Sequence, residues 1–167
     1  MSKKKLIEAV INNDLKKVKT LLKKVSVNTT DNHGRTALMY AAADEWSIEI
    51  VKMLLEEGAD INIKDNYGST ALMQGAYSGH VETVKLLTEK EADINAKDGE
   101  GETALMYAAR SGRVDTAALL IEKRVDIDAI NTRGGSAFEL AIARGHIGVS
   151  KLLKEAGAKY FGFTLYE

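Results

Sequence analysis

The most constraining feature of the sequence is a repeat with a period of about 33 residues. Its copies begin with similar runs, DNHGRTALMYAA, DNYGSTALMQGA, DGEGETALMYAA and NTRGGSAFELAI, and each continues into apolar residues spaced three and four apart. A fixed period of about 20–50 residues indicates stacked structural units. Four units therefore occupy residues 31–64, 65–97, 98–130 and 131–159, and residues 1–30 carry the second half of the pattern, which makes five units.

Each unit is predicted to hold two short helices and a finger loop. A hydroxyl side chain before an Ala-Leu or Ala-Phe pair suits a helix N-cap. Such caps are predicted at Thr36, Thr70, Thr103 and Ser136. Glycines, which tolerate positive φ, are expected to end the first helices at Gly79, Gly112 and Gly145. A helix of about seven residues is too short to be stable alone, so neighbouring units must bury each other's apolar faces. The sequence thus predicts an all-α solenoid.

The shared pattern is D-x-x-G-x-T-A-L-x-x-A-A-x-x-G-H-x-x-V-x-x-L-L-x-x-G-A-D-I-N, which resembles the ankyrin repeat over residues from about 5 to 159. The resemblance implies an ankyrin-repeat solenoid of helix-turn-helix units joined by β-hairpin-like finger loops. It also implies one domain over residues 1–167, with an N-terminal capping repeat (1–30), three internal repeats (31–64, 65–97, 98–130), a C-terminal capping repeat (131–159) and an aromatic tail (160–167).

The chain departs from the family pattern at several positions. Alanine follows each N-cap where the family usually has proline, and the family's next histidine is replaced by Met39, Met73, Met106 and Glu139. Packing is expected to replace the lost hydrogen bond in the three methionine units. Glu91 and Arg124 stand at the helix C′ position that glycine holds elsewhere, where a non-glycine residue at positive φ costs about 1 kcal/mol. We therefore expect softer joints there.

In the ankyrin family, partners usually contact the fingertips and the exposed face of the first helices, which line a concave groove. The corresponding positions vary between units while the core positions do not, as a recognition surface would, although unselected solvent-exposed positions would vary too. The predicted partner-binding residues carried over by position are Asn32, His33, Arg35, Asp44, Asn66, Tyr67, Ser69, Tyr77, Ser78, Glu100, Glu102, Arg110, Ser111, Arg133 and Arg144.

Aromatic residues refine this prediction. Tyr67 and Tyr77 are the strongest candidates because the repeat predicts that both are exposed, whereas Tyr40 and Tyr107 are expected to pack between units. Trp46, also included among the partner-binding residues, replaces a Gly-His turn near the groove rim. It is predicted either to anchor a partner or to cover the irregular turn. The tail, which holds four of the ten aromatic residues, is expected to cap the last repeat, with a docking peptide as the alternative.

The sequence contains little that suggests chemistry. It has no cysteine, no HExxH, phosphate-binding loop or nucleophile elbow, and no histidine pair spaced for a metal. His80 and His146 occupy the structural Gly-His turn, which leaves His33 alone on a finger. The Asp60-x-Asn62 run fails as a calcium loop because Lys64 occupies a ligand position. We therefore predict no catalytic, cofactor or metal site, and a non-catalytic adaptor or steric inhibitor that binds another protein.

Charge leaves one further alternative open. The net charge is −1, but the first thirty residues hold eight lysines against two acidic residues, which leaves about −7 on the remainder. Nucleic-acid binding by this lysine-rich repeat is the weaker hypothesis. A solvated capping surface accounts for the lysines, and the repeat has neither interleaved aromatic residues nor a nucleic-acid-binding motif. We expect a monomer that binds neither membranes nor a small-molecule substrate, in the cytoplasm or, alternatively, secreted without a recognisable signal peptide. An engineered ankyrin binder is disfavoured because the units differ even at framework sites.

Overall fold

The computed structural model describes residues 2–162, which form ten α-helices. Two helices fall within each of the five units found in the sequence. Their bounds are α1 Ser2–Ile11, α2 Leu15–Leu22, α3 Ala37–Ala43, α4 Ile48–Glu56, α5 Ala71–Ser78, α6 Val81–Glu89, α7 Ala104–Arg110, α8 Val114–Glu122, α9 Ala137–Ala143 and α10 Ile147–Glu155.

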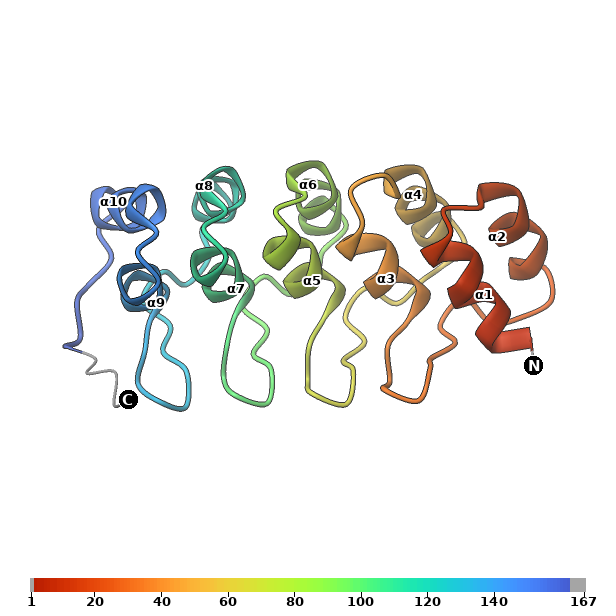
Figure 1. Cartoon of the computed structure of the whole chain (residues 1–167), viewed down its shortest axis with the longest axis horizontal. Helices are drawn as coiled ribbons and strands as arrows, with labels where there is room; N and C mark the ends of the chain where they lie inside the picture. Colours follow the sequence, from red (N-terminus) through yellow and green to blue (C-terminus); the bar gives the residue numbers. More distant parts are fainter. Residues whose placement is uncertain (1, 163–167) are drawn as a thin grey trace.

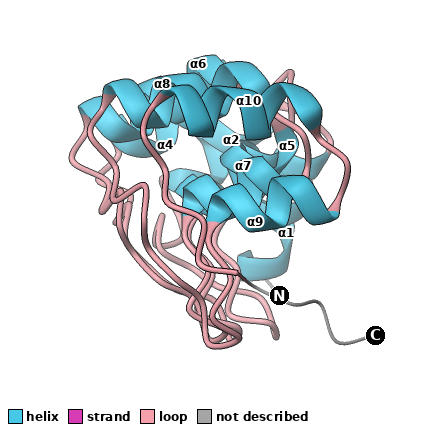
Figure 2. Cartoon of the chain, turned by 90° about the vertical axis from the view of Figure 1, so that its left-hand side faces the viewer, coloured by secondary structure: helices cyan, strands magenta, loops and turns pink. Residues whose placement is uncertain are grey.

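The helices stack as two parallel rows along one long axis (Figure 1). The first helices of the units, α1, α3, α5, α7 and α9, lie between the finger loops and the row of second helices. Seen from the end, the loops run away from the helical layers on one side (Figure 2). Two of the four loops are closed by an isolated antiparallel bridge, Thr30 with Thr36 and Ile130 with Ser136, and no extended strand forms among the described residues. The predicted all-α solenoid with hairpin-like fingers is confirmed.

Local signals set the ends of the first helices as predicted. The four N-cap hydroxyls accept hydrogen bonds from the backbone N–H three residues later, as when Thr36 caps α3 through Met39. Gly79, Gly112 and Gly145 adopt φ of 85°, 70° and 69° directly beyond these helices, a region that glycine enters without steric cost.

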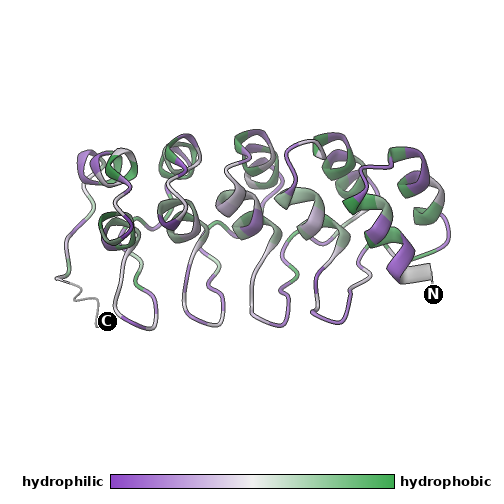
Figure 3. Cartoon of the chain, in the orientation of Figure 1, coloured by the Kyte–Doolittle hydropathy of each residue, from purple (hydrophilic) through white to green (hydrophobic). Residues whose placement is uncertain are grey.

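A single apolar core runs the length of the solenoid from Leu6 to Leu153. Apolar residues lie mainly on the helices, whereas the finger loops are largely hydrophilic (Figure 3). Met39, Met73 and Met106 are all buried, which agrees with packing in place of a hydrogen bond at Met39 and Met106, but the Met73 sulfur accepts the Thr70 backbone N–H at 3.4 Å, so the expectation is wrong for that unit. We call the first helices of the units the inner helices. Because four of them, α3, α5, α7 and α9, have only seven or eight residues, their stability comes from this stacking.

Side chains in the loops that follow the second helices join each unit to the next. Oδ1 of Asn28 accepts the backbone N–H of Asp60 at 2.8 Å, and the step recurs at Asn62, Asn95 and Asp128 with distances of 2.8–2.9 Å. The Asp-Ile-Asn and Asp-Ile-Asp runs thus form an inter-unit ladder of hydrogen bonds rather than cation ligands.

The finger loops are held by a repeated turn. Oδ1 of the first finger residue accepts the backbone N–H groups two and four residues later in all four loops, as at Asp98 with Glu100 and Glu102. Adjacent fingers are also bonded, since the N–H of Gly99 donates to the Tyr67 carbonyl at 2.8 Å and equivalent bonds join the other loops. The fingers therefore form one ordered row.

The predicted joints and tail show two departures from a regular repeat. Glu91 and Arg124 have φ of 65° and 61°, which confirms the expected left-handed conformation. In the tail, the ring of Tyr160 packs edge-on against Phe138 with centroids 6.4 Å apart, and the N–H of Phe161 donates to Glu139 at 2.7 Å. These contacts agree with a capping role for the start of the tail; residues 163–167 lie outside the described residues.

Candidate partner-binding groove

Three depressions lie along the side formed by the inner helices, their C-terminal turns and the fingers. We call them the N-terminal, central and arginine depressions, with volumes of about 460, 560 and 430 Å³. The N-terminal depression is lined by Lys4, Ile7, Glu8, Ile11, Thr30, Asp31, Asn32, His33 and Tyr40. The central depression is lined by Asn66, Tyr67, Gly68, Asp98, Gly99, Glu100, Glu102, Tyr107 and Arg110. The arginine depression is lined by Tyr77, Arg110, Ser111, Arg113 and Arg144.

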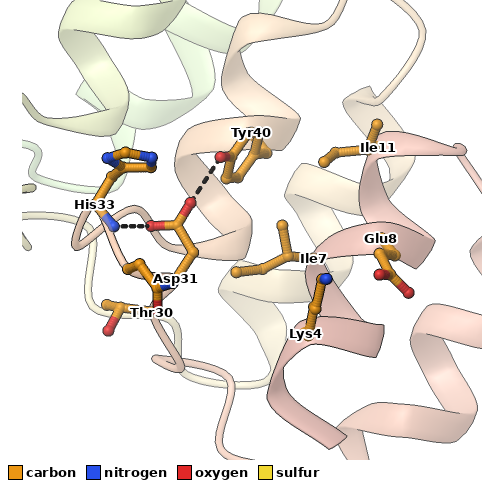
Figure 4. Close-up of a pocket in the computed structure, with 9 residues that line it drawn as sticks. Lys4, Ile7, Glu8, Ile11, Thr30, Asp31, His33 and Tyr40 are labelled. Atoms are coloured by element: carbon orange, nitrogen blue, oxygen red, sulfur yellow. Dashed lines mark hydrogen bonds between the residues drawn. The ribbon is translucent and has the colours of Figure 1, made fainter. Parts of the chain in front are cut away.

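The N-terminal depression combines an apolar wall with a polar one (Figure 4). Ile7 and Ile11 come from α1, and the opposite wall carries Asp31, whose carboxylate accepts the Tyr40 hydroxyl at 2.7 Å and the His33 backbone N–H at 2.8 Å. Burial alone would raise the pKa of Asp31, but these hydrogen bonds, with one from the Arg35 backbone, lower it. The depression can thus accept an apolar side chain beside a fixed negative charge.

The central depression is built around Tyr107 of α7. Its hydroxyl donates to Oδ2 of Asp98 at 2.8 Å, and burial together with this carboxylate raises the pKa of Tyr107 to about 12. The Arg110 guanidinium lies 4.9 Å from the centre of the same ring and forms a 2.9 Å ion pair with Glu102. Burial raises the pKa of Glu102, which the Arg110 charge opposes. The inner wall of this depression is therefore held rigidly by buried polar contacts.

The two tyrosines singled out in the sequence are exposed as predicted. Tyr67 is 66% exposed at a fingertip, and Tyr77 is 50% exposed at the end of α5. The ring of Tyr77 packs edge-on against Tyr107, with centroids 6.3 Å apart. Tyr107 contacts the preceding unit, as expected, yet it also lines the central depression, and Tyr40 likewise lines the N-terminal one.

For two residues the expectation of an exposed side chain is wrong. Ser69 and Glu102 are each only 3% exposed. Both stand at the last finger position, where the chain turns under its own inner helix: Ser69 accepts a hydrogen bond from Gln74, and Glu102 pairs with Arg110. Ser69 lines none of the three depressions, and Glu102 lines the central one only as a buried carboxylate held by Arg110.

Trp46 is exposed to 75%, so its ring does not cover the irregular turn between α3 and α4. That turn is stabilised instead by the buried Ser47, whose hydroxyl donates to Asp44 at 2.5 Å, and by Asn13, whose side chain donates to the Trp46 carbonyl at 3.2 Å. The tryptophan ring is thus free to meet a partner at the groove rim.

The structure gathers some of the predicted residues and leaves others apart. Asn32 and His33 line the N-terminal depression; Asn66, Tyr67, Glu100 and Arg110 line the central one; Tyr77, Ser111 and Arg144 join Arg110 in the arginine depression. The side chains of Arg35, Asp44, Trp46, Ser78 and Arg133 line none of the three. Arg133 instead pairs with Glu100 of the neighbouring finger.

The sequence reasoning missed two groups of groove residues. Arg113 lines the arginine depression, and its signal was that it replaces the histidine found at positions 80 and 146. Lys4, Ile7 and Ile11 line the N-terminal depression, and their spacing of three and four on α1 could have revealed a common face. Ile11 is 58% exposed although it belongs to that apolar face.

Within residues 2–162, no group of three or more histidine, aspartate or glutamate side chains is arranged to hold a metal ion. In the same range no helix is both long and apolar enough to cross a membrane. What the groove offers chemically is exposed aromatic rings and fixed charges.

Two rows of short antiparallel helices with projecting finger loops define a helical-repeat solenoid, a class that presents an extended surface along one side. The family model described as ankyrin repeats in three copies matches residues 6–98 and again residues 92–161, so the chain belongs to the ankyrin-repeat family. The repeats of this family are generally protein-interaction modules and are typically non-catalytic. No curated protein matches the sequence significantly.

Proposed function

We propose that the chain binds another protein along its groove and acts as an adaptor or a steric inhibitor. The observation that carries the proposal is the placement of Tyr67 and Tyr77. Both rings are exposed, and they border two adjoining depressions that share the anchored Arg110. Tyrosine and arginine are enriched among the interface residues that dominate binding energy.

Rigidity supports the same proposal. The ring of Tyr77 packs against Tyr107, whose hydroxyl donates a hydrogen bond to Asp98. The Tyr67 carbonyl accepts a hydrogen bond from the backbone of the next finger. A partner would therefore meet a surface that is already ordered, so little conformational entropy would be lost on binding.

The nucleic-acid alternative draws on a different part of the molecule. The lysines at 16, 17, 19, 23 and 24 are exposed on and just after α2, and none of them lines the three depressions. Nucleic-acid binding there would fall steeply with salt, whereas binding centred on the groove tyrosines would persist.

The test is an affinity pull-down with the intact chain beside the Tyr67→Ala/Tyr77→Ala double variant, followed by affinity measurement with the purified partner. Loss of the two rings should weaken binding at least about tenfold, since each aromatic contact of this kind is worth roughly 1–2 kcal/mol.

The matched control is Ile147→Ala, which removes a 78% exposed apolar side chain from the row of second helices. It should leave the affinity within about twofold of the intact chain. Equal recovery of a partner by the intact chain and the tyrosine double variant would contradict the groove assignment.

A further inference from the structure

The arginine depression brings together three guanidinium groups on a chain whose residues 31–167 carry about −7. Arg110 ends α7, Arg113 precedes α8 and Arg144 follows α9, with Tyr77 and Ser111 completing the lining. Glu102 is the one carboxylate paired with them in the described part of the chain, through Arg110. Three positive side chains are thus gathered in one hollow within the acidic part of the chain.

Arg113 is fixed by a framework contact that leaves part of its charge group free. Its Nε donates to the Tyr77 carbonyl at 3.1 Å. His80 and His146 stand at the same repeat position, and their Nε2 atoms meet the carbonyls of Ala43 and Arg110 at 3.0 Å. Arg113 makes the histidine's contact with Nε alone, so both Nη groups remain to bind an anion.

The glycine turn of the preceding unit leaves room for the Arg113 side chain, as Gly112 does for His146. A Cβ on Gly79 would lie 2.7 Å from Cδ of Arg113, so a side chain there would displace it. The carbonyls of Tyr77 and Arg110, at the ends of α5 and α7, are occupied by Arg113 and His146. These two carbonyl oxygens already accept hydrogen bonds, so they do not compete with an anion for the free Nη groups of Arg113.

The other two arginines differ in how firmly they are held. Arg110 is oriented by its ion pair with the buried Glu102 and by the Tyr107 ring. Arg144 is exposed and makes no ion pair with any residue between 2 and 162, and the nearby exposed Asp115 pairs with none of the arginines. Two fixed guanidinium groups and one adjustable group face the same hollow.

We propose that the arginine depression binds the carboxylates of a Glu- or Asp-rich segment of a partner protein. The inference rests on the proposed function and names the chemistry of that partner at one end of the groove. Planar guanidinium forks pair with carboxylates through two parallel hydrogen bonds, and preorganised ones lose little entropy in doing so. The hollow of about 430 Å³ has room for the carboxylate side chains of an acidic peptide, whereas a long nucleic acid would extend past it and meet nearby acidic residues such as Asp115.

The test uses the repeat itself to supply substitutions. Arg113→His and Arg144→Ser each introduce the residue found at the same position of another unit, histidine as at 80 and 146 and serine as at 78 and 111. The imidazole that Arg113→His introduces can keep the Tyr77 carbonyl contact, and at about pH 8 it is uncharged. The probe is a fluorescein-labelled octaglutamate peptide, and its binding to the full chain is followed by fluorescence anisotropy.

The double variant should bind the peptide at least about tenfold more weakly than the intact chain, and Arg144→Ser alone about threefold more weakly. The control Lys23→Gln/Lys24→Gln removes the same two charges from exposed positions beyond α2 and should stay within about twofold. Since Arg144 has no ion pair within the described residues, its replacement leaves the fold intact, and a thermal melt checks the double variant.

The proposal is overturned if the intact chain does not bind octaglutamate, or if the arginine and lysine variants weaken binding equally. It is also overturned if a labelled DNA duplex binds more tightly than the peptide and is lost in the same arginine variant. A partner that is lost only by the Tyr67→Ala/Tyr77→Ala variant leaves the proposed function standing without this inference. If peptide binding is lost only in the arginine variant, and the tyrosine double variant recovers the partner as well as the intact chain does, the acidic-segment site stands and the proposed function fails.

Discussion

At the scale of single residues, the aspartate that begins a finger shows how one neighbour changes an otherwise repeated contact. Asp31 and Asp98 use Oδ1 for the finger backbone and Oδ2 for the hydroxyl of Tyr40 or Tyr107. Asp65 holds its finger in the same way, but its unit has Gln74 at the tyrosine position, and Gln74 donates to Ser69 instead. Oδ2 of Asp65 is consequently buried without a hydrogen bond.

Gln74→Tyr is therefore predicted to stabilise the protein. The new hydroxyl should donate to Oδ2 of Asp65 and raise the free energy of unfolding by about 0.5–1.5 kcal/mol, the usual net value of one hydrogen bond and somewhat more for a charged acceptor. The Arg35 side chain, whose Nε lies 3.6 Å from that oxygen, is 40% exposed and can move aside. Urea unfolding measures the change.

Gln74→Phe provides the control, because it adds the same ring without the hydroxyl. If the phenylalanine and tyrosine variants unfold at the same urea concentration, a new hydrogen bond to Oδ2 of Asp65 is not the source of the gain.

At the scale of the elements, the second helices of the second to fifth units end in two ways. Gly58 and Gly157 turn the chain at φ of 81° and 91° after α4 and α10, whereas Glu91 and Arg124 adopt 65° and 61° after α6 and α8. The left-handed region costs a residue with a Cβ more than it costs glycine. The same turn is thus made with strain in the third and fourth units.

Replacing Glu91 and Arg124 by glycine should raise the free energy of unfolding by about 0.5–1 kcal/mol at each site, because relief of the strain exceeds the added entropy of the unfolded chain. Both side chains are exposed, so little packing is lost. Denaturant unfolding gives the change, and hydrogen exchange should show slower local opening at the ends of α6 and α8.

Glu57→Gly is the matched control, since Glu57 is exposed at the end of α4 but has φ of −81°. Glycine there should be neutral or destabilising. A similar gain from all three substitutions would mean that backbone strain does not explain the effect.

At the scale of the whole molecule, the solenoid must close its apolar core at both ends. At the amino end, α1 and α2 form the first unit, whose lysines at 16, 17, 19, 23 and 24 are exposed to solvent. At the carboxyl end, Glu139 receives the N–H of Ser136 through one oxygen and that of Phe161 through the other, while Tyr160 packs on Phe138. The residue that replaces the methionine of the other units therefore joins the last helix pair to the chain beyond it.

Removing residues 160–167 is predicted to lower the free energy of unfolding by roughly 1–2 kcal/mol, through loss of the Tyr160 ring contact and of the hydrogen bond to the buried Glu139. Because units contact mainly their neighbours, amides of α9 and α10 should lose more hydrogen-exchange protection than those of α3 and α4. Unchanged stability would instead favour the tail as a docking peptide.

Much of the fold and part of the groove could be predicted from the sequence. The 33-residue period, the hydroxyl caps at Thr36 and its equivalents, and the positive φ at Glu91 and Arg124 follow from local chemistry repeated in register. The exposure of Tyr67 and Tyr77 follows from the same register, since every unit places a given position on the same face. Because the helices are too short to be stable alone, the sequence also predicted that neighbouring units stack.

Only the tertiary structure decided which side chains meet across units. The repeat pattern predicted that Ser69 and Glu102 are on the surface. Both are buried in the structure, where Ser69 accepts a hydrogen bond from Gln74 and Glu102 forms an ion pair with Arg110. The role of Arg113 depends on a carbonyl 36 positions earlier in the chain. A repeating sequence fixes the path of the backbone, whereas contacts between units also depend on the length, rotamer and charge of each side chain, which vary from one repeat to the next.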